Sequence, residues 1–158
     1  MRKANFLNEL YKEEKLKEVE PNEIIAKAYL EKSRKSISSA KALLEIGNLE
    51  DSVVLAYYGM YHSAIALLFR TGIKCENHSA AIVLLKKVFN IDNSAISKAK
   101  YERVDKQYYI DFSISRQETM DAIKSAEDFS SKLKDFIDRL SNENIAEYHK
   151  AAIKIILA

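Results

Sequence analysis

The sequence contains very little glycine, proline and cysteine: three Gly, one Pro and one Cys among 158 residues. Because glycine and proline are the strongest breakers of regular structure, long stretches without them favour helices over a turn-rich β fold. The single cysteine, Cys75, excludes an internal disulfide and suits a reducing compartment. With one cysteine and only three histidines, a structural zinc site is not expected, and we predict no metal and no cofactor.

The chain also lacks a strong charge of either sign. Its 25 Lys and Arg residues nearly balance its 23 Asp and Glu residues, which leaves a net charge of +2. This balance predicts neither a basic surface for DNA nor an acidic substrate. The apolar content of 47% is ordinary for a soluble domain, and a chain of this length can bury a real core as one domain.

No hydrophobic run is long enough to cross a bilayer comfortably. The longest, residues 53–69, falls just short of the roughly 20 residues that a spanning helix needs, and His62 near its middle is costly in lipid. Residues 1–20 mix both charge signs without a long apolar core, unlike a signal peptide. We therefore expect a soluble, cytoplasmic protein without membrane contact.

The run at 53–69 is instead the centre of a helical pattern. It is apolar on nearly every face, so as a helix it must be surrounded by other helices. One-sided apolar patterns predict further helices near 5–17, 22–46, 79–89, 96–104, 115–140 and 145–156, and no strand pattern is present. We predict an all-α, up-and-down bundle of four to five core helices at residues 21–141, with short extra helices at 1–20 and 142–158.

Several predicted helix ends carry recognisable signals. Asn22 is a good cap for the helix that follows it, and Gly47 supplies a left-handed stop at the end of that helix. Ser115 and Glu118 have the spacing of a capping box. Residues 108–112 read as an irregular link between two helices.

The central run also carries a sequence motif. It reads Ala56-Tyr57-Tyr58-Gly59-Met60-Tyr61-His62-Ser63-Ala64 and is followed by His78-Ser79 at the predicted start of the next helix. With its surroundings at residues 51–90, this motif resembles the HEPN domain family, in particular a prokaryotic branch. The resemblance implies a helical bundle that forms a homodimer and often partners a minimal nucleotidyltransferase in a toxin–antitoxin-like pair. Some members are metal-independent ribonucleases that use a closely spaced Arg and His.

This chain does not match that ribonuclease signature. Arg70 and His78 stand farther apart than the signature requires, and Arg103 is followed by tyrosines rather than by a histidine. The leading interpretation is therefore a dimeric, non-catalytic module that binds a nucleotidyltransferase, a nucleotide or RNA. The alternative is a metal-independent endoribonuclease, in which His78 would move a proton off a 2′-hydroxyl and Arg70 would stabilise the developing charge. A purely structural oligomer is a third hypothesis.

The candidate ligand-binding residues each have a structural interpretation as well. His78 and Ser79 at a helix start favour an anion, together with nearby Lys74, but either residue could simply cap the helix. His62 is either ligand-facing or a core histidine bonded to a neighbouring Ser or Tyr. The tyrosines either pack in the core or offer a surface on which bases stack. The predicted ligand-binding set is Tyr58, Tyr61, His62, Lys74 and Ser79, with Arg70 and His78 as the candidate catalytic pair.

Overall fold

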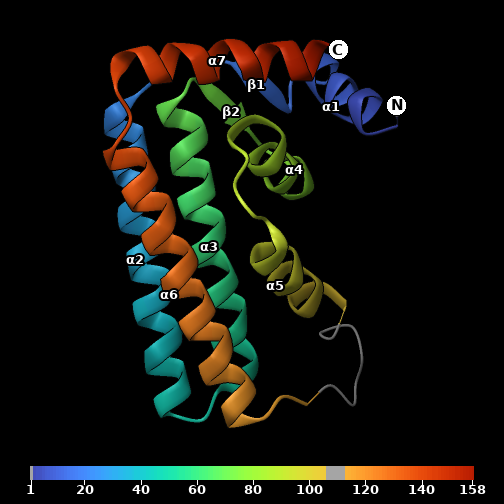
Figure 1. Cartoon of the computed structure of the whole chain (residues 1–158). Coiled ribbons are helices and arrows are strands. Elements are labelled where there is room, and N and C mark those ends of the chain that lie inside the picture. Colours follow the sequence, from blue (N-terminus) through green and yellow to red (C-terminus); the bar gives the residue numbers. More distant parts are fainter. Residues whose placement is uncertain (1, 106–112) are drawn as a thin grey trace.

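The computed structural model of the protein describes residues 2–105 and 113–158, without the side chains of residues 2–5, 104 and 105. Three long helices, α2 (Glu23–Glu45), α3 (Leu49–Arg70) and α6 (Arg116–Asp138), lie side by side along the bundle (Figure 1). Helices α4 (His78–Phe89) and α5 (Ser94–Asp105) follow the other flank of α3, and α7 (Asn142–Leu157) crosses the upper end, where it meets α1 (Arg2–Lys12). The predicted all-α bundle is confirmed, whereas the predicted link at 108–112 lies outside the described residues.

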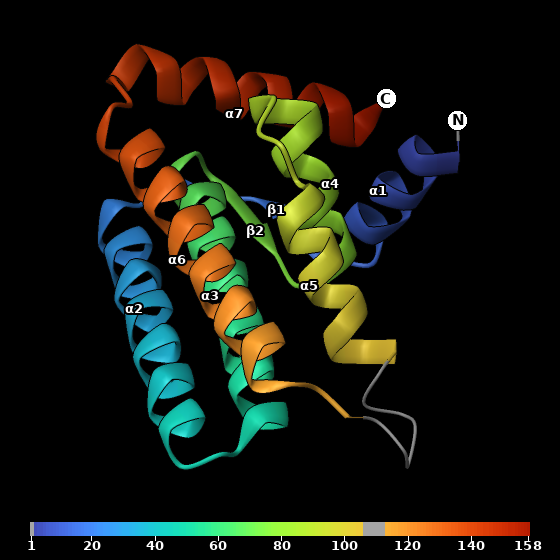
Figure 2. The ribbon, with the colours of Figure 1, turned by 60° about the horizontal axis from the view of Figure 1, so that its bottom comes forward.

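Helix α3 is the central element of the fold, as its sequence predicts. It contacts α2, α4, α5 and α6, and Figure 2 shows it between α2 and α6. Tyr57, Met60, Leu67 and Leu68 are among its fully buried side chains, and each large apolar side chain contributes about 1.5–3 kcal/mol by leaving water. By length and composition α3 could cross a membrane, but 67% of its most apolar window is buried inside the bundle, as is usual for a core helix.

Small residues let α2 and α3 approach closely. A Cβ atom on Gly59 would lie 2.5 Å from Cγ1 of Ile37. The Ser33 hydroxyl donates to the Gly59 carbonyl at 2.6 Å, and the Ser52 hydroxyl donates to the Ala40 carbonyl at the same distance. These buried bonds satisfy polar groups that would otherwise oppose such close packing.

The helix starts for which a cap was predicted follow the sequence signals with one exception. Oδ1 of Asn22 accepts from the Ile25 amide at 2.9 Å, and Ser115 forms the predicted capping box with Glu118. Helix α4 begins at His78 as expected, but its cap is Asn77, whose Oδ1 accepts from the Ala80 amide at 2.9 Å. The expectation that His78 or Ser79 caps this helix is therefore wrong, because the extended backbone that a cap needs belongs to Asn77.

The structure also corrects the expectation of no strands. Two strands, β1 (Leu16–Glu18) and β2 (Ile73–Cys75), pair antiparallel with Leu16 opposite Cys75. Each strand has three residues, too few for an alternating pattern to stand out in a sequence. The first helix ends at Lys12 instead of residue 17, and the chain turns at Glu14 into β1. Since β2 leads directly to His78, this small sheet helps to position the start of α4.

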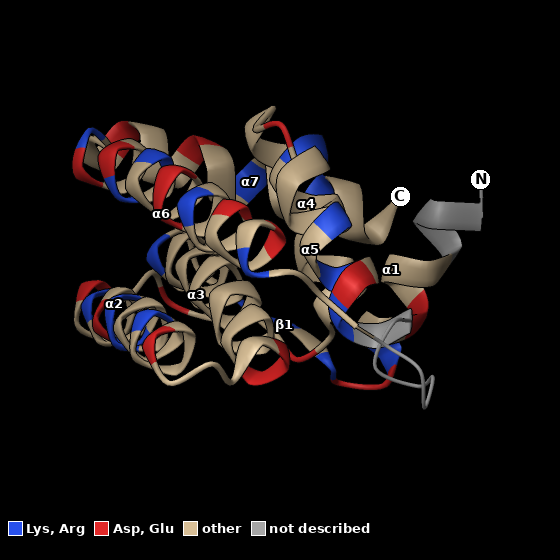
Figure 3. Ribbon diagram, turned by 90° about the horizontal axis from the view of Figure 1, so that it is seen from below, with Lys and Arg blue, Asp and Glu red and all other residues tan. Residues whose placement is uncertain are grey.

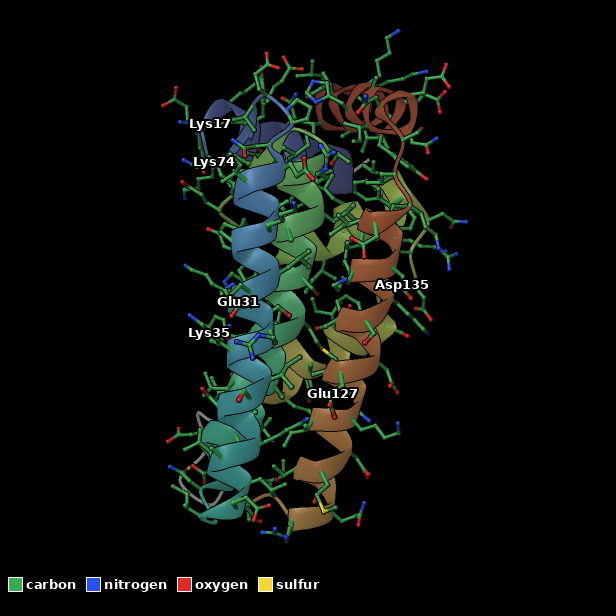
Figure 4. All side chains as sticks on the ribbon, turned by 90° about the vertical axis from the view of Figure 1, so that its left-hand side faces the viewer. Lys17, Glu31, Lys35, Lys74, Glu127 and Asp135 are labelled. Atoms are coloured by element: carbon green, nitrogen blue, oxygen red, sulfur yellow. The ribbon has the colours of Figure 1, made fainter. Side chains whose placement is uncertain are left out.

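Charged side chains of both signs are interspersed on the outer faces of α2 and α6, whereas α3 is almost free of them (Figure 3). Figure 4 shows Glu31 and Lys35 on the outer side of α2, with Glu127 and Asp135 on α6. Many of these groups form exposed ion pairs, such as Lys41 with Glu127 at 2.8 Å, and each such pair contributes little to stability. The outer faces therefore offer no broad surface of one sign, as the net charge predicts.

Candidate functional site

His78 lies at the junction of β2 and α4, against the tyrosines of α3. Its ring stacks on the Tyr61 ring with centroids 3.8 Å apart and planes 13° apart. Its Nδ1 atom is 2.7 Å from the hydroxyl oxygen of Tyr57, a side chain with no exposed surface. The His78 ring is thus positioned by stacking on Tyr61 and by a hydrogen bond between Nδ1 and Tyr57.

The hydrogen bond between Tyr57 and His78 has a defined direction. Burial raises the pKa of Tyr57 well above its ordinary value, so its phenol keeps its proton. Within the described residues, the Tyr57 hydroxyl bonds to no group other than His78. If it accepted from Nδ1–H, its own buried O–H would lack an acceptor, at a cost of about 1–3 kcal/mol. Tyr57 therefore donates to Nδ1, and neutral His78 carries its proton on Nε2.

The charge state of His78 follows from the same contacts. Burial lowers its pKa, and the positive charges of Arg103 and Lys100 and the proximity of His62 act in the same direction. The Tyr57 bond adds to this, because an imidazolium would place a proton on the nitrogen that Tyr57 needs as acceptor. At neutral pH His78 is thus an uncharged donor, and its Nε2 makes no bond to any described residue and is open to solvent.

Arg103 of α5 completes one side of the site. Its guanidinium carbon lies 4.8 Å from the Tyr57 ring centre and 5.4 Å from that of Tyr58, and Nη1 donates to the Tyr58 hydroxyl at 3.3 Å. Its Nε is buried without an acceptor, and no carboxylate in the described part of the chain pairs with it. A half-buried guanidinium with an N–H group that makes no hydrogen bond costs free energy. The position of Arg103 therefore favours an anionic ligand that can accept from this N–H group.

His62, on the same helix as the three tyrosines, is a second imidazole with an unusual environment. Its ring centre lies 5.8 Å from Tyr58 and 6.0 Å from Tyr61. Nδ1 is buried and has no partner among the described residues, so the expected bond to a neighbouring Ser or Tyr is absent and that interpretation is wrong. Burial, together with the charge of Lys32, lowers the His62 pKa. An unpaired buried lone pair is less costly than an unpaired N–H, so the proton of neutral His62 belongs on Nε2.

The other predicted residues lie apart from this cluster. Arg70 is in the last turn of α3, nine residues beyond Tyr61, or about 14 Å along the helix axis. It is not among the groups that shift the His78 pKa. Lys74 lies opposite Lys17 on the strands (Figure 4) and pairs with Glu76 at 3.6 Å. Ser79 is exposed in the first turn of α4. The predicted roles of Arg70, Lys74 and Ser79 stay predictions.

The structure thus brings together four of the predicted residues and adds two that sequence reasoning did not select. Tyr58, Tyr61, His62 and His78 form one cluster, which Tyr57 and Arg103 complete. Tyr57 belongs to the motif and could have been selected from it. Arg103 had no comparable signal, because the apolar pattern around it is weak.

Comparison with known proteins places this cluster within a family. The HEPN domain model matches residues 26–136, which include all the residues of the cluster. The chain belongs to the HEPN domain family. The match leaves out α1, β1 and α7.

Three archaeal relatives support this assignment. A UPF0332 protein of Archaeoglobus fulgidus is 28% identical over 116 residues, which cover 70% of this chain and 93% of the relative. The Methanocaldococcus jannaschii protein named "Putative toxin MJ0605" is 26% identical over 113 residues, covering 72% of this chain and 84% of the relative. UPF0332 protein PH1297 of Pyrococcus horikoshii is 48% identical, but only over 50 residues, 32% of this chain and 35% of the relative.

Proposed function

We propose that this HEPN protein binds the phosphate of a nucleotide or of an RNA strand between Arg103 and His78 and does not cleave it. The observation that carries this proposal is the 2.7 Å bond between Tyr57 and His78. It leaves Nε2 of His78 as a free donor. The positive charge of Arg103, which rests on the Tyr57 ring, also acts on His78 and lowers its pKa. Phosphate oxygens are acceptors that match two such donors, and bonds between a guanidinium and a phosphate are among the stronger hydrogen bonds in proteins.

The same bond argues against a catalytic His78. A general base must offer a lone pair to the 2′-hydroxyl of the substrate. Here the lone pair of neutral His78 is on Nδ1, where Tyr57 already uses it, and the accessible nitrogen carries the proton. Moving the proton to Nδ1 would leave the Tyr57 hydroxyl buried without an acceptor. A site arranged in this way favours binding over proton abstraction.

In this proposal the protein acts as a dimeric module in the cytoplasm, in a toxin–antitoxin-like pair with a minimal nucleotidyltransferase. The family resemblance supports the dimer and the partner, and one relative carries the word toxin in its name. A protein that sequesters RNA or nucleotides could act as a toxin without turnover. These assignments stay predictions.

The test is to incubate the purified protein with single-stranded RNA in EDTA, then measure retention on a filter and RNA length on a denaturing gel. We expect the RNA to be retained and to keep its length. Retention should be lost in His78→Ala and kept in Lys87→Gln, which removes an exposed charge from the same helix. Shortened RNA with the parent protein and intact RNA with His78→Ala would instead establish the ribonuclease alternative.

A further inference from the structure

The aromatic cluster continues from the site across α3 to α2. Tyr29 of α2 stacks on Phe69, with centroids 5.5 Å apart and planes 15° apart, and its ring centre is 5.9 Å from that of His62. All three side chains are half-buried, so part of each remains accessible. We call Tyr29, His62 and Phe69, with the neighbouring Tyr58, the α2–α3 aromatic face.

Positive charges border this face. The ammonium of Lys32 lies 5.2 Å from the centre of the Tyr29 ring. Burial is the main cause that lowers the pKa of His62, and the positive charge of Lys32 is the second cause. The charges of Arg103 and Lys100 lower the pKa of His78 in the same way. In the part of the chain that the structure describes, no carboxylate is among the groups that shift the pKa of either imidazole. The face therefore combines accessible rings with a positive field.

We infer that the α2–α3 aromatic face is a subsite for an unpaired base of an RNA strand whose phosphate is bound between Arg103 and His78. This inference rests on the proposed function and names its ligand as a strand instead of a single nucleotide. Bases stack on aromatic side chains regardless of their identity, while Lys and Arg follow the phosphates. In this arrangement the base replaces the Lys32 ammonium over Tyr29, and Lys32 pairs with a phosphate.

The geometry connects the two subsites. Both imidazoles neighbour Tyr61: the His78 ring stacks on it with centres 3.8 Å apart, and the His62 ring is tilted against it with centres 6.0 Å apart. Consecutive nucleotides of one strand can therefore reach both imidazoles. The Nε2–H of His62, which makes no bond to a described residue, offers a donor to the acceptor edge of the stacked base. A mononucleotide can occupy only one of the two places, so a strand should bind more tightly.

A second copy of the chain fits this face less well. In a symmetric dimer the same patch meets itself, which would bring Lys32 and Arg103 of one protomer toward those of the other. Like charges brought together in this way oppose association. A single-stranded polyanion with exposed bases instead complements both the charge and the rings.

The test compares affinities for a fluorescein-labelled short oligouridylate, the matching oligothymidylate, AMP and inorganic phosphate in parent protein and variants. Tyr29→Leu keeps apolar bulk against Phe69 but removes the stacking ring. We expect it to weaken oligouridylate binding about tenfold or more and to leave AMP and phosphate binding unchanged. Lys32→Gln, an exposed change that does not threaten folding, should reduce the salt dependence of RNA binding. The control is Phe136→Leu, which removes a half-buried ring from the separate cluster with Phe89 and Tyr148.

Each other outcome has a distinct meaning. If Tyr29→Leu and Lys32→Gln bind oligouridylate like the parent while Arg103→Met does not, the subsite is refuted and the phosphate site stands. If the parent binds neither RNA nor phosphate, the proposed function fails and the subsite fails with it. If Tyr29→Leu turns a sedimenting dimer into a monomer, a second copy covers the face and the inference is wrong. Tighter binding of oligothymidylate than of oligouridylate would refute RNA as the ligand of this face.

Discussion

Replacing Gly72 by alanine is expected to lower the free energy of unfolding by about 2–5 kcal/mol. Gly72 has φ of +86° at the corner between α3 and β2, a conformation that L-residues with a Cβ adopt only at a cost. A Cβ atom there would lie 2.6 Å from the Val19 carbonyl oxygen and would also meet the His149 ring. That carbonyl belongs to the backbone and cannot move aside without disturbing the β1–β2 pairing.

Gly47 provides a matched control for this prediction. Its φ of +79° is nearly the same, but a Cβ atom there would meet nothing within 4 Å. Gly47→Ala should therefore cost only the backbone strain, about 1–2 kcal/mol. Urea unfolding followed by circular dichroism measures both values. If both variants lose the same free energy of unfolding, the contacts of the added Cβ atom at Gly72 do not destabilise the fold, and the prediction is wrong.

Arg103→Met is expected to weaken RNA and phosphate binding about tenfold to a hundredfold while leaving the fold as stable as before, or more stable. The loss reflects hydrogen bonds to a charged group, each of which contributes about 1.5–3 kcal/mol. The stability gain follows because methionine keeps apolar contact with the Tyr57 and Tyr58 rings and removes the buried, unpaired Nε. A residue kept only for structure would show the opposite pattern.

Fluorescence anisotropy with labelled RNA and thermal unfolding of the same samples give the two readings. Lys98→Met is the control, because Lys98 is an exposed cation on the same helix. It should lower the RNA affinity far less than Arg103→Met does, because Lys98 is not among the charges that act on His78. If Lys98→Met weakens binding as much as Arg103→Met does, or if Arg103→Met binds RNA normally, Arg103 is not a ligand-binding residue.

Much of the fold could be predicted from local signals in the sequence. The run at 53–69 is apolar on nearly every face, so a helix formed by it must be surrounded by other helices. Helix α3 does lie at the centre of the bundle. Asn22 and Ser115 mark helix starts through side-chain bonds to nearby amides, so their effect needs no distant contact. The motif also selected Tyr58, Tyr61, His62 and His78, which the structure brings together.

The remaining features depend on contacts between residues far apart in sequence. Strands β1 and β2 are too short to show a pattern, and their pairing joins Leu16 to Cys75. Arg103 lies on α5, a helix with a weak apolar pattern, whereas His78 begins α4, and both contact Tyr57 of α3. No spacing rule applied along the chain can find a pair that is formed by the packing of α4 and α5 around α3.

The most direct test of the account is the location of the His78 imidazole proton, since binding without cleavage depends on it. Long-range ¹H–¹⁵N NMR spectra of the labelled protein at pH 7, with His78→Gln to assign the signals, report which nitrogen is protonated. We predict a neutral ring with its proton on Nε2, which becomes an imidazolium only below the ordinary histidine pKa of 6.5. A proton on Nδ1 at pH 7, or an imidazolium there, would contradict the account.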